Sequence, residues 1–109
     1  MDILVSVVNQ RLKITTNLKD LVAGTENFIR FIFDLSSDWD DLSTFVQFVQ
    51  NGTPYNVTLD QDKSAYLPKQ ITPGKCTMVL AGNGTNKIAV TNYLTLTIDS
   101  NILITEVES

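Results

Sequence analysis

The chain has 109 residues, 43% of them hydrophobic and 18% charged, and its formal net charge at pH 7 is −4. This length suits one domain whose core is large enough to fold without a metal or a disulfide, and the composition is that of a globular protein. A net negative charge disfavours duplex DNA and anionic membranes, so we expect no nucleic acid and no membrane among the partners.

The residues on which most enzymes depend are absent or unpaired. There is no histidine, the commonest general base and a frequent zinc ligand, and the single cysteine, Cys76, cannot form an internal disulfide. Neither a glycine-rich phosphate loop nor a nucleophile elbow occurs. We therefore predict a protein that is not an enzyme, uses no metal or cofactor, and buries Cys76 as a small hydrophobic residue.

The N-terminal part of the chain is typical of two short strands. Residues 3–8 and 11–16 are rich in apolar and β-branched residues, and Asn9-Gln10 between them is a plausible hairpin turn. The first residues lack the basic and apolar regions of a signal peptide, and no apolar run is long enough to span a membrane. Residues 18–22 fit either a strand or one helical turn.

Residues 27–35 (NFIRFIFDL) predict a strand with an unusually apolar outer side, because they are rich in aromatic and β-branched residues. Alternation divides the side chains between two faces, with Ile29, Phe31 and Phe33 on one and Phe28, Arg30 and Ile32 on the other. Apolar residues on both faces indicate a central strand, or a strand whose outer face a partner covers. The second set, Phe28, Arg30 and Ile32, therefore supplies candidate contact residues.

The stretch 34–59 is the strongest local signal in the chain. Asn51-Gly52 lies between two strand-like runs and predicts a type I′ hairpin, whose central residues both need a positive φ. This loop pairs Gln50 with Thr53, Phe48 with Tyr55, Val46 with Val57 and Thr44 with Leu59. Trp39, just upstream, is expected to pack on the apolar face as a core anchor. The aspartates around Trp39 have the chemistry to chelate calcium, although turn capping explains them as well.

Residues 60–92 predict a short strand at 65–67 and a longer strand at 75–82. The turn that follows, 82–86, permits two registers. A two-residue loop, Asn83-Gly84, places Leu80 opposite Lys87, whereas a three-residue loop, 83–85, places Leu80 opposite Ile88. We predict the three-residue loop, because it sets apolar residues opposite each other.

The last segments are a regular strand at 93–99 and an apolar tail at 101–109, which fits a final edge strand or an arm lying on a neighbour. Some eight short, mostly antiparallel strands without a long helix predict an immunoglobulin-like β-sandwich over residues 1–100. We expect the tail to contact a neighbouring subunit through Ile102, Ile104 and Val107. Its acids, Glu106 and Glu108, would then reach toward a basic surface of that subunit.

Charge is unevenly distributed along the chain. Residues 63–98 contain four lysines and no acid, whereas residues 1–62 and 99–109 are both acidic. Such a distribution fits a mixed solvated surface, or a molecule with an acidic and a basic end suited to ordered packing. On the second interpretation the basic contact residues are Lys63, Lys69, Lys75 and Lys87.

Aromatic residues outside the core offer a different function. Tyr66 and Tyr93 could stack on sugar rings, as aromatic side chains do in small carbohydrate-binding sandwiches. The alternative is that both tyrosines are half-buried strand residues. Exposure of the two rings on one face would favour the carbohydrate-binding module.

A series of strand and turn motifs runs through residues 3–99, namely FIFDLSSDWDDL, FVQF, YNVTL, YLPKQITPGK, MVLAG and TNYLTLTI. In this order they resemble the small β-sandwich at the N-terminus of phage head-fibre, baseplate and tail-fibre proteins. The resemblance implies a structural virion protein of a tailed bacteriophage, either a capsid auxiliary or decoration protein or a head-fibre attachment module. A tail or baseplate adaptor is the alternative within this class.

The same resemblance implies where the protein acts and with what. Its partners would be the major capsid protein or fibre and baseplate proteins, together with further copies of itself in a homo-oligomer or lattice. It would be made in the cytoplasm of the host bacterium and would reside in the virion, on the capsid surface rather than the tail.

Overall fold

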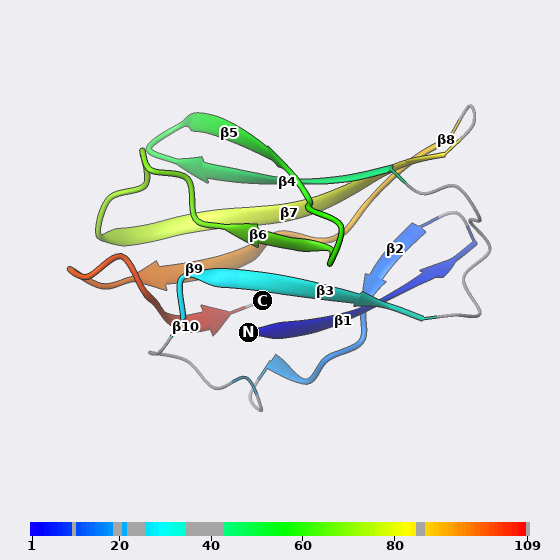
Figure 1. The fold of residues 1–109 in the computed structure, drawn as a ribbon, viewed down its shortest axis with the longest axis horizontal. Coiled ribbons are helices and arrows are strands. Elements are labelled where there is room, and N and C mark those ends of the chain that lie inside the picture. The colour runs from blue at the N-terminus through cyan, green and yellow to red at the C-terminus, as the bar shows by residue number, and fades with distance from the viewer. Residues whose placement is uncertain (10, 19–20, 22–25, 35–42, 85–86, 109) are drawn as a thin grey trace.

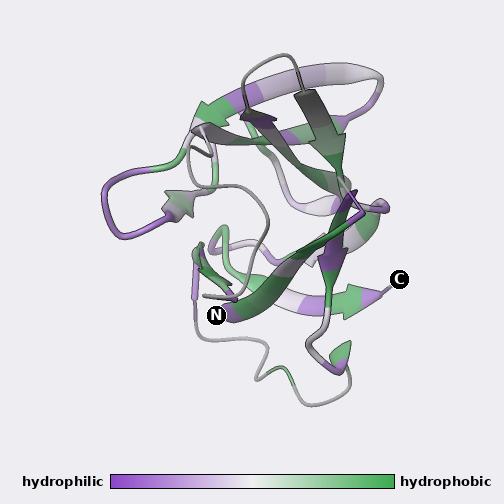
Figure 2. Cartoon of the chain, turned by 90° about the vertical axis from the view of Figure 1, so that its right-hand side faces the viewer, coloured by the Kyte–Doolittle hydropathy of each residue, from purple (hydrophilic) through white to green (hydrophobic). Residues whose placement is uncertain are grey.

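The computed structural model describes residues 1–9, 11–18, 21, 26–34, 43–84 and 87–108. Within these ranges the chain forms ten β-strands and no α-helix, and the strands build two sheets that share one hydrophobic core (Figure 1). The predicted all-β sandwich is therefore confirmed, with ten strands in place of about eight. Hydrophobic residues lie along the strands of both sheets, whereas much of the connecting chain is hydrophilic (Figure 2).

The first sheet has four strands in the order β2-β1-β3-β6. These strands are β1 (Asp2–Val8), β2 (Arg11–Ile14), β3 (Phe28–Phe33) and β6 (Ser64–Tyr66). β1 pairs antiparallel with β2 and parallel with β3, and β6 closes the other edge antiparallel to β3. The predicted Asn9-Gln10 turn fits the observed pairing of Val8 with Arg11, and Asn9 has the positive φ, 50°, that such a turn favours.

The second sheet has six strands, with the order β10-β9-β7-β4-β5 and β8 paired to β7. The strands are β4 (Ser43–Gln50), β5 (Thr53–Thr58), β7 (Gly74–Gly84), β8 (Lys87–Val90), β9 (Leu94–Ile98) and β10 (Ile104–Glu108). All the pairings within this sheet are antiparallel. Only the β1–β3 pair, in the other sheet, is parallel among the described strands, so the predicted predominance of antiparallel pairs is confirmed.

The β4–β5 hairpin has the predicted turn and register. Asn51 and Gly52 have φ values of 52° and 79°, as a type I′ turn requires. The strand pairs are Gln50 with Thr53, Phe48 with Tyr55 and Val46 with Val57, and the Leu59 amide donates to the Thr44 carbonyl. On the polar face, Gln47 Nε2 donates to Asn56 Oδ1 at 3.0 Å. The predicted anchor, Trp39, lies outside the described residues.

The predicted register after β7 is wrong. Gly84 pairs with Lys87 and Ala81 with Val90, so neither loop considered for residues 82–86 is the observed one. The reason is that β7 continues to Gly84, so the turn begins later than predicted. β7 pairs with β9 over its first half and with β8 over its last residues. Between Ala81↔Val90 and Met78↔Leu94, β7 has two residues and the opposite segment three, so residues 91–93 form a bulge.

The core lies between the sheets and takes its largest side chains from both. Phe31, Ile3 and Ile29 come from the four-stranded sheet, and Phe48 and Met78 from the six-stranded sheet. Cys76 is buried among them, as predicted. Burial raises the pKa of the Cys76 thiol to about 11, because the apolar surroundings disfavour the thiolate.

The tail belongs to the core of its own domain. β10 pairs with β9 as the edge strand of the six-stranded sheet, and the Ile104 side chain is only 1% exposed. The edge-strand alternative for the tail is therefore the one observed, over residues 104–108. The prediction that Ile104 contacts a neighbour is wrong for its side chain, because that side chain is buried in its own chain. The Ile104 amide also donates to the Glu26 carbonyl at 2.8 Å.

Candidate functional site

The outer side of the four-stranded sheet is an open surface that gathers the predicted contact residues of β3. Side chains alternate along each strand, and paired residues on neighbouring strands point to the same side. The burial patterns of β1, β2 and β3 follow this alternation. We call this surface the outer face, and it comprises Asp2, Leu4, Ser6, Val8, Arg11, Lys13, Phe28, Arg30, Ile32, Ser64 and Tyr66.

An apolar pair lies in the middle of the outer face. Leu4 of β1 and Ile32 of β3 are register partners, with exposed fractions of 47% and 39%. Val8 of β1 is 48% exposed on the same side. Single exposed apolar residues are common on protein surfaces, whereas adjacent ones on an open sheet indicate a contact surface.

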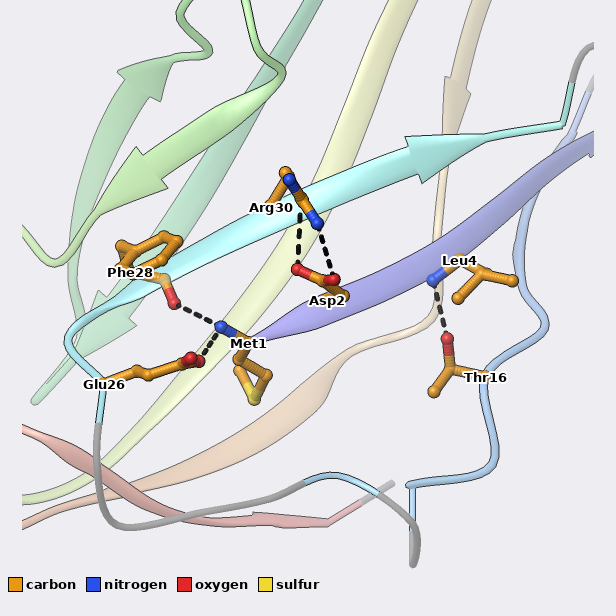
Figure 3. Close-up of polar contacts among 7 residues, drawn as sticks. All are labelled: Met1, Asp2, Leu4, Thr16, Glu26, Phe28 and Arg30. Atoms are coloured by element: carbon orange, nitrogen blue, oxygen red, sulfur yellow. Dashed lines mark hydrogen bonds and ion pairs between the residues drawn. The ribbon is translucent and has the colours of Figure 1, made fainter.

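An ion pair lies next to the apolar pair, two residues earlier on both β1 and β3. Arg30 Nη2 lies 2.7 Å from Asp2 Oδ2, and Arg30 Nε lies 3.1 Å from Asp2 Oδ1, so the two side chains form a bidentate pair (Figure 3). The hydrogen bond from Arg30 lowers the pKa of Asp2, and the same bond raises the pKa of Arg30. Both side chains are about half exposed, so the pair presents one positive and one negative group to any partner.

Backbone contacts hold β1 in place at both ends of this region. The Leu4 amide donates to Thr16 Oγ1 at 2.6 Å, which extends the pairing of the β2 segment beyond the strand (Figure 3). The Met1 amino group forms an ion pair with Glu26 and donates to the Phe28 carbonyl at 3.4 Å. These contacts tie the first residues of β1 to the segment after β2 on one side and to the start of β3 on the other.

An aromatic pair on the outer face lies beside the ion pair. Phe28 and Tyr66 are register partners on β3 and β6, and their ring centroids lie 5.6 Å apart with the planes tilted by 44°. Tyr66 is 62% exposed, and Phe28 beside it is half-buried. Tyr93 is also exposed, but it lies between β8 and β9 in the six-stranded sheet.

The two edges of the outer face carry opposite charge. Arg11 and Lys13 are exposed on β2, at one edge. Asp62 is exposed in the turn before β6 and lies at the other edge. The pKa of Arg30 is raised mainly by Asp2, and the negative charge of Asp62 adds to this rise, so Asp62 lies near Arg30. The Asp60 carboxylate in the same turn accepts hydrogen bonds from the amides of Asp62 and Ser64, which fixes the turn.

The remaining predicted contact residues differ in exposure. Ile102 and Val107 are half-buried against the core, and Lys69 and Lys75 are exposed at separate places along the chain. Lys63 is half-buried with a φ of 58°, and the side chain of Lys87 lies outside the described part. Lys75 Nζ lies 4.0 Å from Glu108 Oε2 of the same chain, so this acid of the tail already has a basic neighbour.

Among the described residues, no three side chains of the types that hold metal ions come together, and no helix is long and apolar enough to cross a membrane. In comparisons with known proteins, no family model, curated protein or solved structure matches the chain. The outer face, with its apolar centre and paired charges, has the chemistry of a binding surface.

Proposed function

We propose that this chain is a structural virion protein of a tailed bacteriophage, a capsid auxiliary or decoration protein or a head-fibre attachment module, that acts by protein–protein contacts. The observation that supports it best is the exposed Leu4–Ile32 pair at the centre of the outer face. The motifs that resemble phage virion modules supply the class of assembly.

The chemistry of the outer face favours a protein partner over a small molecule. A sheet face is broad and shallow, whereas small ligands are held in concave pockets that bury most of their surface. Apolar residues at the centre with charged residues around them match the core and rim of a protein interface. The domain already has its own core, so Leu4 and Ile32 are not needed to complete it.

The partners proposed on this basis are other virion proteins, with the major capsid protein first and fibre or baseplate proteins as the alternative. A capsid location predicts that the chain stays with the head when heads and tails are separated. A tail or baseplate adaptor predicts that it stays with the tail. No enzymatic activity is proposed, because the sequence has no histidine and its single cysteine is buried.

The test is mass spectrometry of purified phage particles after heads and tails have been separated on a density gradient. We expect this chain in the head fraction at a constant copy number per particle. Recovery in the tail fraction would favour the adaptor alternative. Absence from washed particles, with all of the chain in the soluble lysate, would overturn the proposal.

A carbohydrate-binding module is the second candidate, and the exposed Tyr66 ring favours it. The predicted pair of Tyr66 and Tyr93 comes from different sheets, so the second ring beside Tyr66 is Phe28. A glycan array of the isolated protein tests this function. Binding that Tyr66→Ala abolishes and Tyr93→Ala preserves would support it, and no binding by the wild-type protein would remove it.

A further inference from the structure

We infer that the occupant of the outer face is a second copy of this chain, related to the first by a two-fold axis that runs parallel to β1 and β3. The inference rests on the proposed role of the outer face as a contact surface. It adds the identity of a partner and the geometry of the contact. The reason is that the outer face is complementary to itself.

The first step is the arrangement of charge across the sheet. The strand order places β2, with Arg11 and Lys13, at one edge and β6, preceded by Asp62, at the other. The centre, between β1 and β3, holds the Asp2–Arg30 pair beside the Leu4–Ile32 pair. The outer face is therefore basic at one edge, acidic at the other and apolar in the middle.

The second step is symmetry. When two copies stack face to face about an axis along the strands, left and right exchange, so β2 of one copy lies over β6 of the other. Lys13 is then the closer of the two basic residues to the partner's Asp62, and this contact occurs twice. An axis across the strands would set β2 on β2 and place basic residues together, which costs free energy. Charge therefore selects the axis along the strands.

The third step is the centre of the contact. The same axis passes between β1 and β3, so it places Leu4 over the partner's Ile32 and Ile32 over the partner's Leu4. In the neighbouring row, Asp2 lies over the partner's Arg30 and Arg30 over the partner's Asp2. In these two central rows, apolar groups meet apolar groups and charges meet their opposites, as isologous interfaces require.

The size of the outer face sets the expected strength. Four strands spaced by about 4.8 Å and up to seven residues long give a face of about 19 by 23 Å, or about 900 Å² buried in total by two copies. Interfaces of this size are typical of weak complexes. We expect a dissociation constant of about 1 to 100 µM at low salt, rising with ionic strength because the edge contacts are charged.

Sedimentation velocity of the full chain with charge-reversal variants tests the inference. Lys13→Glu alone sets a carboxylate against Asp62 at both symmetric contacts, and Asp62→Lys alone sets two lysines together. Each single variant should therefore dimerise about tenfold or more weakly than wild type. An equimolar mixture of the two should dimerise within about threefold of wild type, because both edge contacts in the mixed dimer again join opposite charges.

Lys75→Glu, an exposed lysine on the six-stranded sheet, is the matched control and should dimerise like wild type. Wild type that is monomeric up to about 1 mM would overturn the inference. Single variants that dimerise normally, or a mixture that does not recover, would overturn it as well. A monomeric chain that is still present in purified particles would leave the proposed virion function standing while removing the dimer.

Discussion

Leu4 and Ile32 lie side by side on the parallel strands β1 and β3, and both side chains point away from the core. Their inward neighbours Ile3 and Phe31 are buried in the core, so the same two strands supply both an interior and an apolar exterior. This relationship is the basis for treating the outer face as a surface that a protein covers. Parallel pairing matters because it brings the start of the chain beside β3.

The tail should be essential for stability. Ile104 is buried in the core and pairs with both β9 and Glu26, so Ile104→Ala removes packed methyl groups and leaves a cavity. We expect a loss of about 2 to 4 kcal/mol in the free energy of unfolding, measured by urea denaturation. Glu106→Ala, an exposed residue of the same strand, should change it by less than about 0.5 kcal/mol. Equal stability of Ile104→Ala and wild type would contradict the core position of β10.

A buried glutamine should hold the loop before β7. Gln50 is buried, its Oε1 accepts from the Thr72 amide at 2.8 Å, and its Nε2 donates to the Thr72 carbonyl at 2.8 Å. Gln50→Ala breaks both bonds and should cost about 1 to 3 kcal/mol. Gln47→Ala, which loses only the bond to Asn56 on the polar face, should cost clearly less. If the two variants unfold at the same urea concentration, the buried hydrogen bonds of Gln50 contribute no more to the free energy of unfolding than the exposed bond of Gln47.

Two turns of the chain share one geometry, and one of them can be improved. Lys63 and Ile102 have φ values of 58° and 61°, each three residues after an aspartate whose carboxylate caps the turn. Positive φ costs a residue with a side chain about 1 to 2 kcal/mol, whereas glycine adopts it freely. Glycine also makes the unfolded chain more flexible, which offsets part of this gain. Lys63→Gly should therefore raise the free energy of unfolding by about 0.5 to 1 kcal/mol.

Lys13→Gly provides the opposite control, because Lys13 lies within β2, where glycine weakens a strand. Thermal melts of the two variants should move in opposite directions. A lower melting temperature for Lys63→Gly than for wild type would contradict this prediction. It would show that the Lys63 side chain stabilises the fold by more than its positive φ costs.

Local signals predicted much of this fold. Asn51-Gly52 specifies the β4–β5 turn and hence its register, and alternation along residues 27–35 assigned Phe28, Arg30 and Ile32 correctly to the outer side of β3. Both features depend on residues a few positions apart. For that reason the candidate contact residues of β3 were accessible from the sequence.

Features that depend on distant residues were not predicted. The parallel pairing of β1 with β3 joins segments 28 positions apart and places Leu4 and Asp2 on the outer face, and no local pattern signals it. The positive φ values of Lys63 and Ile102 were not predicted, because such values are typical of glycine and asparagine. The tail was assigned to a neighbour, although β10 pairs with the nearby β9, as in Val107 with Leu96.

The buried thiol should be chemically inert in the folded state. The Cys76 pKa of about 11, against an ordinary 9.0, reduces the thiolate fraction near pH 8 by about 100-fold. Alkylation by iodoacetamide should therefore be at least about 100-fold slower than in urea. Because the folded pKa is raised, the associated stability is fully present below about pH 9 and is lost as the pH rises toward 11. Rapid labelling of the native protein at pH 8 would contradict the buried position.

The most direct test of the outer face as the contact surface of a virion protein is the incorporation of two matched variants into particles. Ile32→Lys places a charge at the centre of the outer face. Val90→Lys makes the same change at a residue of β8 that is 54% exposed on the other sheet. Both variants should fold, as judged by thermal melts, because both side chains are exposed.

Phage produced in the presence of each variant, in place of the wild-type chain, should differ in composition. By quantitative mass spectrometry of purified particles, we expect Val90→Lys at the wild-type copy number and Ile32→Lys reduced about tenfold or more, since the charge must be desolvated in the contact. Equal incorporation of the two variants, or a loss confined to Val90→Lys, would contradict the assignment of the outer face as the contact surface.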